Sequence, residues 1–356
     1  MTRFIPIKKS LQENQATIGI SGEVFSIPEV GLSVHDGITS GGVLLQERTK
    51  TAGENILRNG SFIVNQNGNS WQSIPTSGNI EYIVDGWFYH RGGGSTANAA
   101  VSTALASTLP VATKALRVTT FSGDADNSFS VICQQISGVN LLDGQTVTIS
   151  FWAKTTSSRR IAVTLRQDYD NTEGTNEIFL GNPSLSNDWV FYSYTTTVPK
   201  AKTTTAFGVN NFTGLWIWLE AGSNYDARTG GIGTQSGQTD IANVKMEVGD
   251  SATPFGSFNQ ENETLKVQQY YEKHFDDIFM FNGAYNDTAN IKCNVYIPFV
   301  PKIKPPEVTI NTNFLNSPSI SVISKKGFNV LGTPNSASSV ARVTDYIANA
   351  EILPYY

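Results

Sequence analysis

Short strand-like segments dominate the sequence between residues 54 and 258. About ten of them follow one another, each bounded by Gly, Asn, Asp or Pro, with no segment of helical period in between. In several of them apolar residues alternate with period two, as side chains do along a β-strand. This pattern predicts an all-β fold in which antiparallel sheets form a jelly-roll sandwich. The segments are RNGSFIVNQ, YIVDGWFYH, KALRVTTF, SFSVICQQI, GQTVTISFWAKT, RRIAVTLRQDY, DWVFYSYTTTV, TAFGVNN, LWIWLEA and TDIANVKMEVG.

The charge pattern argues against two classes of partner. Charged residues make up 15% of the chain, the net charge is −5, and no Lys/Arg cluster is larger than SKK or SRR. Binding to nucleic acid requires a basic stripe that neutralises phosphates, so we expect no nucleic-acid partner. Because no window of about 18 apolar residues occurs, we also expect no membrane insertion.

The cysteines and the N-terminus bear on the compartment. Cys133 and Cys293 lie in different strand-like segments, where we expect buried free thiols and no disulfide framework. The apolar stretch in MTRFIPIKKS is too short for a signal peptide, so synthesis in a cytoplasm is expected.

The chain divides into four predicted parts. Residues 1–53 contain two short apolar pieces, GEVFSI and GLSVHDG, which cannot close a core alone. We therefore expect an N-terminal attachment segment that docks on another copy or on a larger assembly. The jelly roll follows over residues 54–258, and GSNYDARTGGIGTQSGQ (222–238) is interpreted as a long mobile loop within it.

A linking helix and a second β-sandwich are predicted beyond the jelly roll. The helix lies within residues 259–275 and Asn262 is expected to cap it. Its apolar stripe is Val267, Tyr270, Tyr271 and His274. Residues 276–356, with the alternating segment NIKCNVYIPF, form the second, C-terminal β-sandwich.

Tryptophans occupy the non-core face of two predicted strands. In LWIWLEA, Trp216 and Trp218 are out of phase with Leu215, Ile217 and Leu219, and Trp152 has the same relation to its neighbours in TISFWAK. Flat aromatic rings beside polar groups suit the C–H faces and hydroxyls of a sugar. The candidate ligand-binding residues are Trp152, Trp216, Trp218, Glu220, Tyr225 and Arg228.

A structural role for these tryptophans is the alternative. They would then pack in a subunit interface or beneath the long loop, since aromatic residues are also enriched at protein interfaces. Trp87 lies between turn signals and is expected in the core, whereas the position of Trp71 is left open.

The order of the motifs resembles that of bacteriophage tail fibre and receptor-binding proteins. GLSVHDGITSGG is similar to a glycine-rich repeat near their N-termini. The set NILRNGSFIVNQNG, YIVDGWFYHR, VTISFWAKT and TDIANVKMEVGDSATPF resembles their carbohydrate-binding-module-like jelly roll, and VQQYYEKHF, YIPFVPKIKPPEVTI and DYIANAEI resemble their distal β domain. The resemblance implies a homotrimer in the virion that binds tail or baseplate proteins through its N-terminus. A host surface glycan or other receptor would be its distal partner.

Two features bear on this resemblance. Gly86 stands where the family often carries a basic residue between the Asp and Trp of YIVDGW. Some relatives hold a structural calcium near the first and last strands, for which Asp240 and Glu247 are candidate oxygen ligands. Two carboxylates alone are weak evidence for a calcium site.

The sequence gives little support for catalysis. Its three histidines are scattered, and it contains no HExxH, GxSxG or P-loop motif. We therefore expect no catalytic residue, no metal and no cofactor. The alternatives are a glycan-degrading tail spike, which would need a carboxylate pair, and a structural tail or baseplate adaptor without receptor contact.

Overall fold

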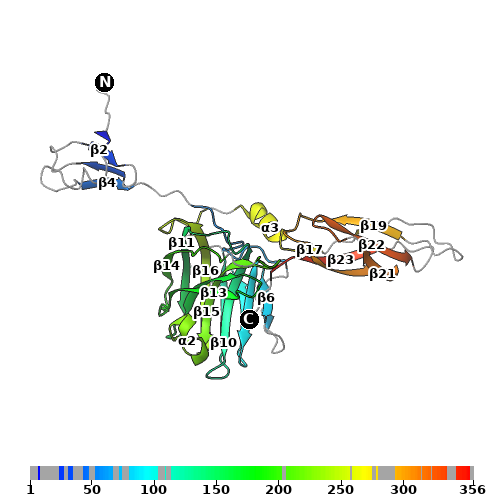
Figure 1. The fold of residues 1–356 in the computed structure, drawn as a ribbon, viewed down its shortest axis with the longest axis horizontal. Coiled ribbons are helices and arrows are strands. Elements are labelled where there is room, and N and C mark those ends of the chain that lie inside the picture. The colour runs from blue at the N-terminus through cyan, green and yellow to red at the C-terminus, as the bar shows by residue number, and fades with distance from the viewer. Residues whose placement is uncertain are drawn as a thin grey trace. The chain divides into compact units, whose positions relative to one another are not determined.

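The computed structural model describes most of the chain beyond residue 52 and four strands before it (Figure 1). The described residues are 7–8, 24–27, 31–34, 43–47, 53–66, 72–73, 80–102, 109, 114–202, 206–256, 259–274, 278–279, 293–313, 315–321, 323–334 and 342–352. Trp71 lies outside them, as does most of the glycine-rich GLSVHDGITSGG segment.

The chain separates into two compact units, Met1–Ala52 and Gly53–Tyr356. In the first unit, one sheet contains β1 (Ile7–Lys8), β2 (Val24–Ile27), β3 (Gly31–Val34) and β4 (Val43–Glu47). Strands β2 and β3 fall in the two apolar pieces seen in the sequence, and β1 joins β2 in parallel. The attachment role of this segment stays a prediction.

Two six-stranded antiparallel sheets form the predicted jelly-roll sandwich (Figure 1). The first contains, in spatial order, β13 (Thr175–Gly181), β12 (Ala162–Asp168), β15 (Phe212–Ala221), β10 (Phe129–Ser137), β7 (Trp87–Gly92) and β6 (Ile80–Val84). The second contains β14 (Val190–Thr197), β11 (Thr146–Thr155), β16 (Gly237–Val248), β9 (Ala115–Phe121), β8 (Thr96–Ser102) and β5 (Gln72–Ser73). The all-β fold class is confirmed.

The core of the jelly roll lies between the two sheets. Strand β11 contributes Ile149 and Phe151, and β15 contributes Leu215, Ile217 and Leu219, as the period-two alternation requires. Trp87 is also buried there, as expected, and its indole Nε1 donates to the carbonyl oxygen of Asn59 at 3.2 Å.

Some predicted strands differ from the observed ones. YIVDGWFYH is a hairpin, β6 and β7, whose turn places Gly86 at a φ of +82°. RNGSFIVNQ is irregular because the Asn59 side chain forms hydrogen bonds with backbone groups that a strand would pair with its neighbours. Its amide nitrogen donates to the carbonyls of Val64 and Asp85 at 2.8 Å, and its amide oxygen accepts from the backbone N–H of Val64. The described part of TAFGVNN is also not a strand.

The segment after β15 is not one long loop. A 3₁₀ turn (Ser223–Tyr225) leads into the short helix α2 (Asp226–Thr229), and β16 already begins at Gly237. Gly230 ends α2 in the left-handed conformation that favours glycine, with φ +64°. The interpretation of residues 222–238 as one long loop is therefore wrong, because this segment contains a 3₁₀ turn, a short helix and the start of a strand.

The linking helix α3 (Gln260–Gln268) begins earlier than predicted. Its N-cap is Asn259, whose side chain accepts from the backbone N–H groups of Glu261 and Asn262, so Asn262 is not the cap. The helix also ends earlier. Tyr271 begins strand β17 (Tyr271–His274), because the backbone there pairs with β23 (Arg342–Asn349).

The C-terminal residues form the second sandwich. One sheet contains β17, β23, β18 (Ile278–Phe279) and β20 (Glu307–Asn313), and the other contains β19 (Cys293–Pro298), β22 (Gly327–Pro334) and β21 (Leu315–Ser321). Between them lie the buried side chains of Ile297, Phe299, Phe328, Val330, Val343 and Tyr346.

A buried joint connects this second sandwich to the jelly roll. The Arg58 guanidinium pairs with the Glu351 carboxylate at 3.0 Å and lies 3.5 Å from the centre of the Tyr270 ring. Arg58 also lies against Gly86. Gly86 is the position in YIVDGW where related proteins often carry a basic residue, so here a basic side chain from another part of the chain lies beside it. Lys304 adds a contact by donating to Asn210 at 2.9 Å. The two modules therefore share buried polar contacts.

Candidate functional site

An aromatic cluster covers the outer face of the β13–β12–β15–β10–β7–β6 sheet. We call this surface the tryptophan face, and its main members are Trp216, Trp218, Phe129, His90 and Arg166. The two indole rings lie 5.9 Å apart, and His90 and Phe129 approach them at 5.6 and 6.2 Å between ring centroids. Both tryptophans point away from the core between the sheets, as the sequence predicts, yet both are 0% exposed.

The same chain buries these indoles. Tyr225, from the turn after β15, lies 5.8 Å from Trp218 and 5.1 Å from Phe129 between ring centroids, and Ile232 joins the same apolar cluster. The expectation that Trp216 and Trp218 are open to a ligand or a second copy is therefore wrong. The alternative of packing beneath the 222–238 segment is what the structure shows for Trp218, whereas Trp216 lies against His90 and Arg166.

A buried guanidinium organises the charges on the tryptophan face. Arg166 lies 4.8 Å from the centre of the Trp216 ring, 3.6 Å from the Asp168 carboxylate and 3.9 Å from the Glu177 carboxylate. Burial raises the pKa of both carboxyls despite this positive charge. Burial, helped by the Arg166 charge, lowers the pKa of His90 to about 3, so this histidine is neutral at physiological pH.

A chain of hydrogen bonds runs outward from the buried indole. Trp218 Nε1 donates to Thr164 Oγ1 at 3.1 Å, and this hydroxyl donates to Glu177 Oε1 at 2.7 Å. Because the indole can only donate, the hydroxyl proton is directed to the carboxylate. The second oxygen of Glu177 lies 3.9 Å from Arg166 Nη1, within ion-pair distance.

The accessible part of this face is its margin. Phe179 on β13 is 45% exposed and lies opposite Thr164 in the strand register. Arg228 on α2 is close enough to Glu177 and Tyr225 for its charge to lower their pKa values, although burial, the larger effect, raises both. We call Asp168, Glu177, Phe179, Tyr225 and Arg228 the rim. It offers an exposed ring beside two carboxylates, a phenol and a guanidinium.

Glu220 does not belong to this face. The β10–β15 register shifts so that Ser130 pairs with Glu220 while Val131 pairs with Trp218, which makes a β-bulge at Leu219. The bulge turns Glu220 toward the core, where its carboxylate accepts from Ser128 at 2.6 Å. Burial raises the pKa of the core residue Tyr89, and the nearby Glu220 charge adds to this.

Trp152 lies on the other sheet. It packs against Ala115 and Ala242 and lies 5.4 Å from the Phe191 ring, on the outer face of the β14–β11–β16–β9 layer. The structure thus brings together Trp216, Trp218, Tyr225 and Arg228 of the six predicted residues, and it separates Trp152 and Glu220 from them. Phe179 was missed because TNEIFLG is too polar to stand out as a strand.

The two candidate calcium ligands already have positive partners. Arg117 binds the Asp240 carboxylate through two nitrogens at 2.6 and 2.7 Å. Lys245 approaches Glu247 at 3.1 Å. In the described part of the chain, no group of three or more His, Cys, Asp or Glu side chains could hold a metal ion. With Arg117 and Lys245 in place, neither Asp240 nor Glu247 is free to bind calcium.

Two further sequence expectations concern the cysteines and membrane insertion. Cys133 is a buried free thiol, whereas the side chain of Cys293 lies outside the described residues. Among the described helices, none is long and apolar enough to cross a membrane.

One family of known proteins matches part of the jelly roll. Residues 55–211 match the family described as Carbohydrate binding domain. This match covers the strands from β5 to β14 and ends just before β15. No curated protein matches the chain.

Several solved structures match the chain at low identity. The enzymatically active domain of tailspike protein 4 from bacteriophage CBA120 shares 17% identity, with a TM-score of 0.32, over 49% of this chain and 21% of that one. A carbohydrate-binding module of family 4 shares 19% identity, with a TM-score of 0.34, over 54% and 99%. The family 11 module from Clostridium thermocellum, in complex with a β-1,3-1,4-mixed-linked tetrasaccharide, shares 12%, with a TM-score of 0.32, over 52% and 99%. TM-scores this low support no functional inference.

Proposed function

We propose that the jelly roll binds a glycan at the rim of the tryptophan face. We also propose that the chain is a receptor-binding tail fibre protein that attaches a virion to a host surface. The observation that carries the first part is the carbohydrate-binding match over residues 55–211. The second part rests on the order of sequence motifs, including the N-terminal segment and the distal β domain.

The rim has the chemistry that a sugar requires. The exposed Phe179 ring offers an apolar face for sugar C–H groups, and the partly exposed Asp168 carboxylate can accept from a hydroxyl. Arg228 supplies donors. The buried tryptophans act beneath as a rigid support, because Trp218 fixes Glu177 through Thr164.

Avidity would compensate for a shallow site. One exposed ring beside two largely buried carboxylates offers a small contact area, so we expect weak binding at each single site. We propose a homotrimer, bound through its N-terminal segment to tail or baseplate proteins. Several sites on one particle then raise the effective concentration and convert weak contacts into firm adsorption.

We propose that the rim binds without hydrolysis. A glycosidase needs two carboxyl groups that flank the scissile bond and take opposite protonation roles. Here Arg166 lies against both Asp168 and Glu177, at 3.6 and 3.9 Å, which ties both carboxylates to one internal cation. Release of oligosaccharides from host polysaccharide, measured as new reducing ends, would favour the glycan-degrading alternative.

A matched pair of phenylalanines tests the binding site. Phe179 and Phe121 have almost equal exposure, 45% and 46%, but Phe121 lies at the end of β9 on the other sheet. In a glycan array followed by calorimetry with the full chain, we expect Phe179→Ala to weaken binding about tenfold or more, a loss typical of one well-placed aromatic contact. Phe121→Ala should bind like the wild type. Equal effects of the two changes would remove the rim from the proposal.

A second experiment asks whether the chain recognises cells and which module does so. Truncation after α3 is unsuitable, because it would leave Arg58 buried without Glu351. Instead, the full chain with Tyr296→Ala and Ile323→Ala alters two exposed residues of the C-terminal sandwich, 51% and 42% exposed. In a cell-adsorption competition assay this variant should compete like the wild type, while Phe179→Ala should not. Failure of the wild type to compete would favour the structural adaptor.

A further inference from the structure

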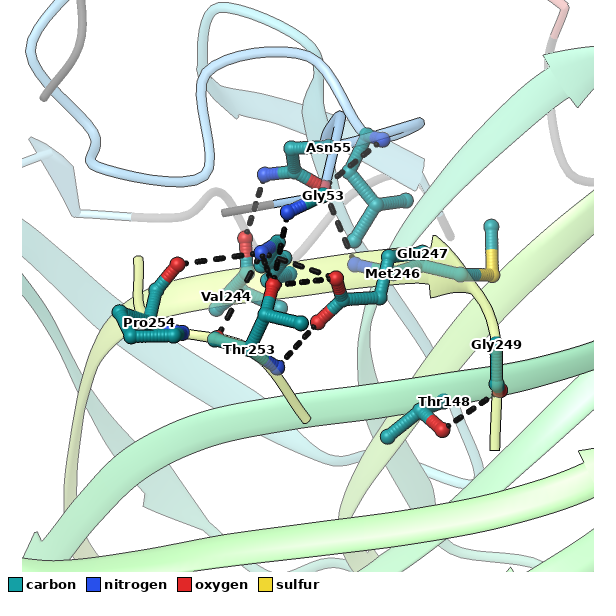
Figure 2. Close-up of polar contacts among 11 residues, drawn as sticks. Gly53, Asn55, Thr148, Val244, Met246, Glu247, Gly249, Thr253 and Pro254 are labelled. Atoms are coloured by element: carbon teal, nitrogen blue, oxygen red, sulfur yellow. Dashed lines mark hydrogen bonds and ion pairs between the residues drawn. The ribbon is translucent and has the colours of Figure 1, made fainter. Parts of the chain in front are cut away.

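A compact polar cluster fastens the start of the jelly roll to its last strand (Figure 2). We call it the lysine knot, and its members are Gly53, Lys245, Glu247, Thr253 and Pro254. Next to it, Asn55 donates to the carbonyl of Val244 at 2.9 Å and accepts from the backbone of Met246 at 3.0 Å. The residues at the beginning of this unit therefore lie along β16.

The centre of the knot is a buried ammonium group surrounded by oxygen atoms. Lys245 Nζ lies 3.1 Å from Glu247 Oε2, 2.6 Å from Thr253 Oγ1, 3.1 Å from the Pro254 carbonyl and 3.5 Å from the Thr253 carbonyl. The side chains of Lys245 and Glu247 are each 2% exposed. These four contacts are all with oxygen acceptors.

The hydrogen-bond directions fit a positive charge at this point. Thr253 Oγ1 accepts from Lys245 and from the backbone N–H of Gly53 at 2.8 Å, so its own proton goes to Glu247 Oε2 at 2.5 Å. The backbone N–H of Thr253 donates to the other Glu247 oxygen at 2.8 Å. A methyl group at Gly53 would overlap the Glu247 carboxylate, so the approach is close.

We infer that the ammonium of Lys245 takes the place of a metal cation in this module. The surrounding oxygens form a latent calcium site that opens only when Lys245 is shortened. One carboxylate oxygen, two carbonyls and a hydroxyl lie around the ammonium, and these are hard ligands of the kind that Ca²⁺ prefers, with water completing the shell. Because Lys245 supplies the positive charge covalently, the wild-type jelly roll needs no calcium to hold its first segment against β16.

Thermal unfolding of the full chain tests both parts of this inference. The Tm of the wild type should be the same in 5 mM CaCl₂ and in 5 mM EDTA. In EDTA, Lys245→Ser should lower the Tm by about 5–10 °C, because it leaves the buried Glu247 carboxylate without its cation. Calcium should recover at least half of this loss. Lys202→Ser is the matched control, since Lys202 is exposed, with 58% of its side chain accessible, and should respond to neither reagent.

Three results would overturn the inference. A fall in the wild-type Tm in EDTA would show that the module depends on a metal despite Lys245. A Lys245→Ser variant as stable in EDTA as the wild type would show that the ammonium is not structural. If Lys245→Ser does not fold when produced, refolding from urea decides: we expect at least fivefold more folded protein with CaCl₂ than with EDTA, and equal yields would refute the latent site.

Discussion

The joint between the two sandwiches predicts a dependence of stability on pH. Glu351 is buried against Arg58 at 3.0 Å, and burial raises the pKa of its carboxyl to about 7 although the Arg58 charge opposes this. In the unfolded chain the same group titrates near 4.5. The folded state therefore holds the proton more tightly than the unfolded state between these two pH values.

The sign and magnitude follow from linkage. A group whose folded pKa is raised contributes stability that is fully present below its unfolded pKa and is lost as the pH rises through the folded pKa. For a carboxyl that changes from 4.5 to about 7, this amounts to about 3 kcal/mol between pH 4 and pH 8. The substitution Glu351→Gln keeps the shape and an acceptor for Arg58 but removes the proton equilibrium.

The assay is urea unfolding of the wild type and Glu351→Gln at several pH values from 4 to 8. We expect the wild type to lose up to about 3 kcal/mol relative to the variant as the pH rises, most of it between pH 5 and 8. Titratable groups that do not interact with Glu351 are common to both proteins and cancel in the difference. A difference that is independent of pH, or one that grows in the wild type's favour as the pH rises, would refute this reasoning.

Three other predictions concern buried side chains and the helix cap. Trp216→Ala should lower the free energy of unfolding by about 3–5 kcal/mol, measured by urea denaturation, because the indole is fully buried; a loss below 1 kcal/mol would contradict its position. Burial raises the pKa of Cys133 to about 12, so its thiol should not react with a thiol reagent at pH 8 in the native protein. The measurement uses a Cys293→Ser background, and rapid labelling of Cys133 would contradict the prediction. Asn259→Ala should cost about 1 kcal/mol and Asn262→Ala much less, and the reverse order would restore the original cap assignment.

The sequence predicts this fold best where side chains alternate strongly. Strands β11 and β15 carry large apolar residues at every second position, so their core faces could be assigned before the structure. By contrast, TANAAVS and TNEIFLG form β8 and β13 through pairing with neighbouring strands, and their own composition does not indicate it. The irregular segment near Asn59 depends on side-chain hydrogen bonds that no hydrophobic pattern reveals.

The candidate site was only partly predictable for a similar reason. Period two correctly turns Trp216 and Trp218 away from the core, but it cannot show that Tyr225 packs on Trp218 or that both indoles are fully buried. It also fails at Glu220, because a one-residue bulge at Leu219 reverses the direction of the side chain. Trp152 has the same local pattern as Trp216, yet it lies on the other sheet.

Hydrogen–deuterium exchange of the full chain, with and without a glycan selected on the array, tests the central claim most directly. If the rim binds the sugar, protection should increase in β13 around Phe179 and in the turn that carries Tyr225 and Arg228. Protection confined to strands β19 to β22 of the C-terminal sandwich, with no change in β13 or that turn, would contradict the account.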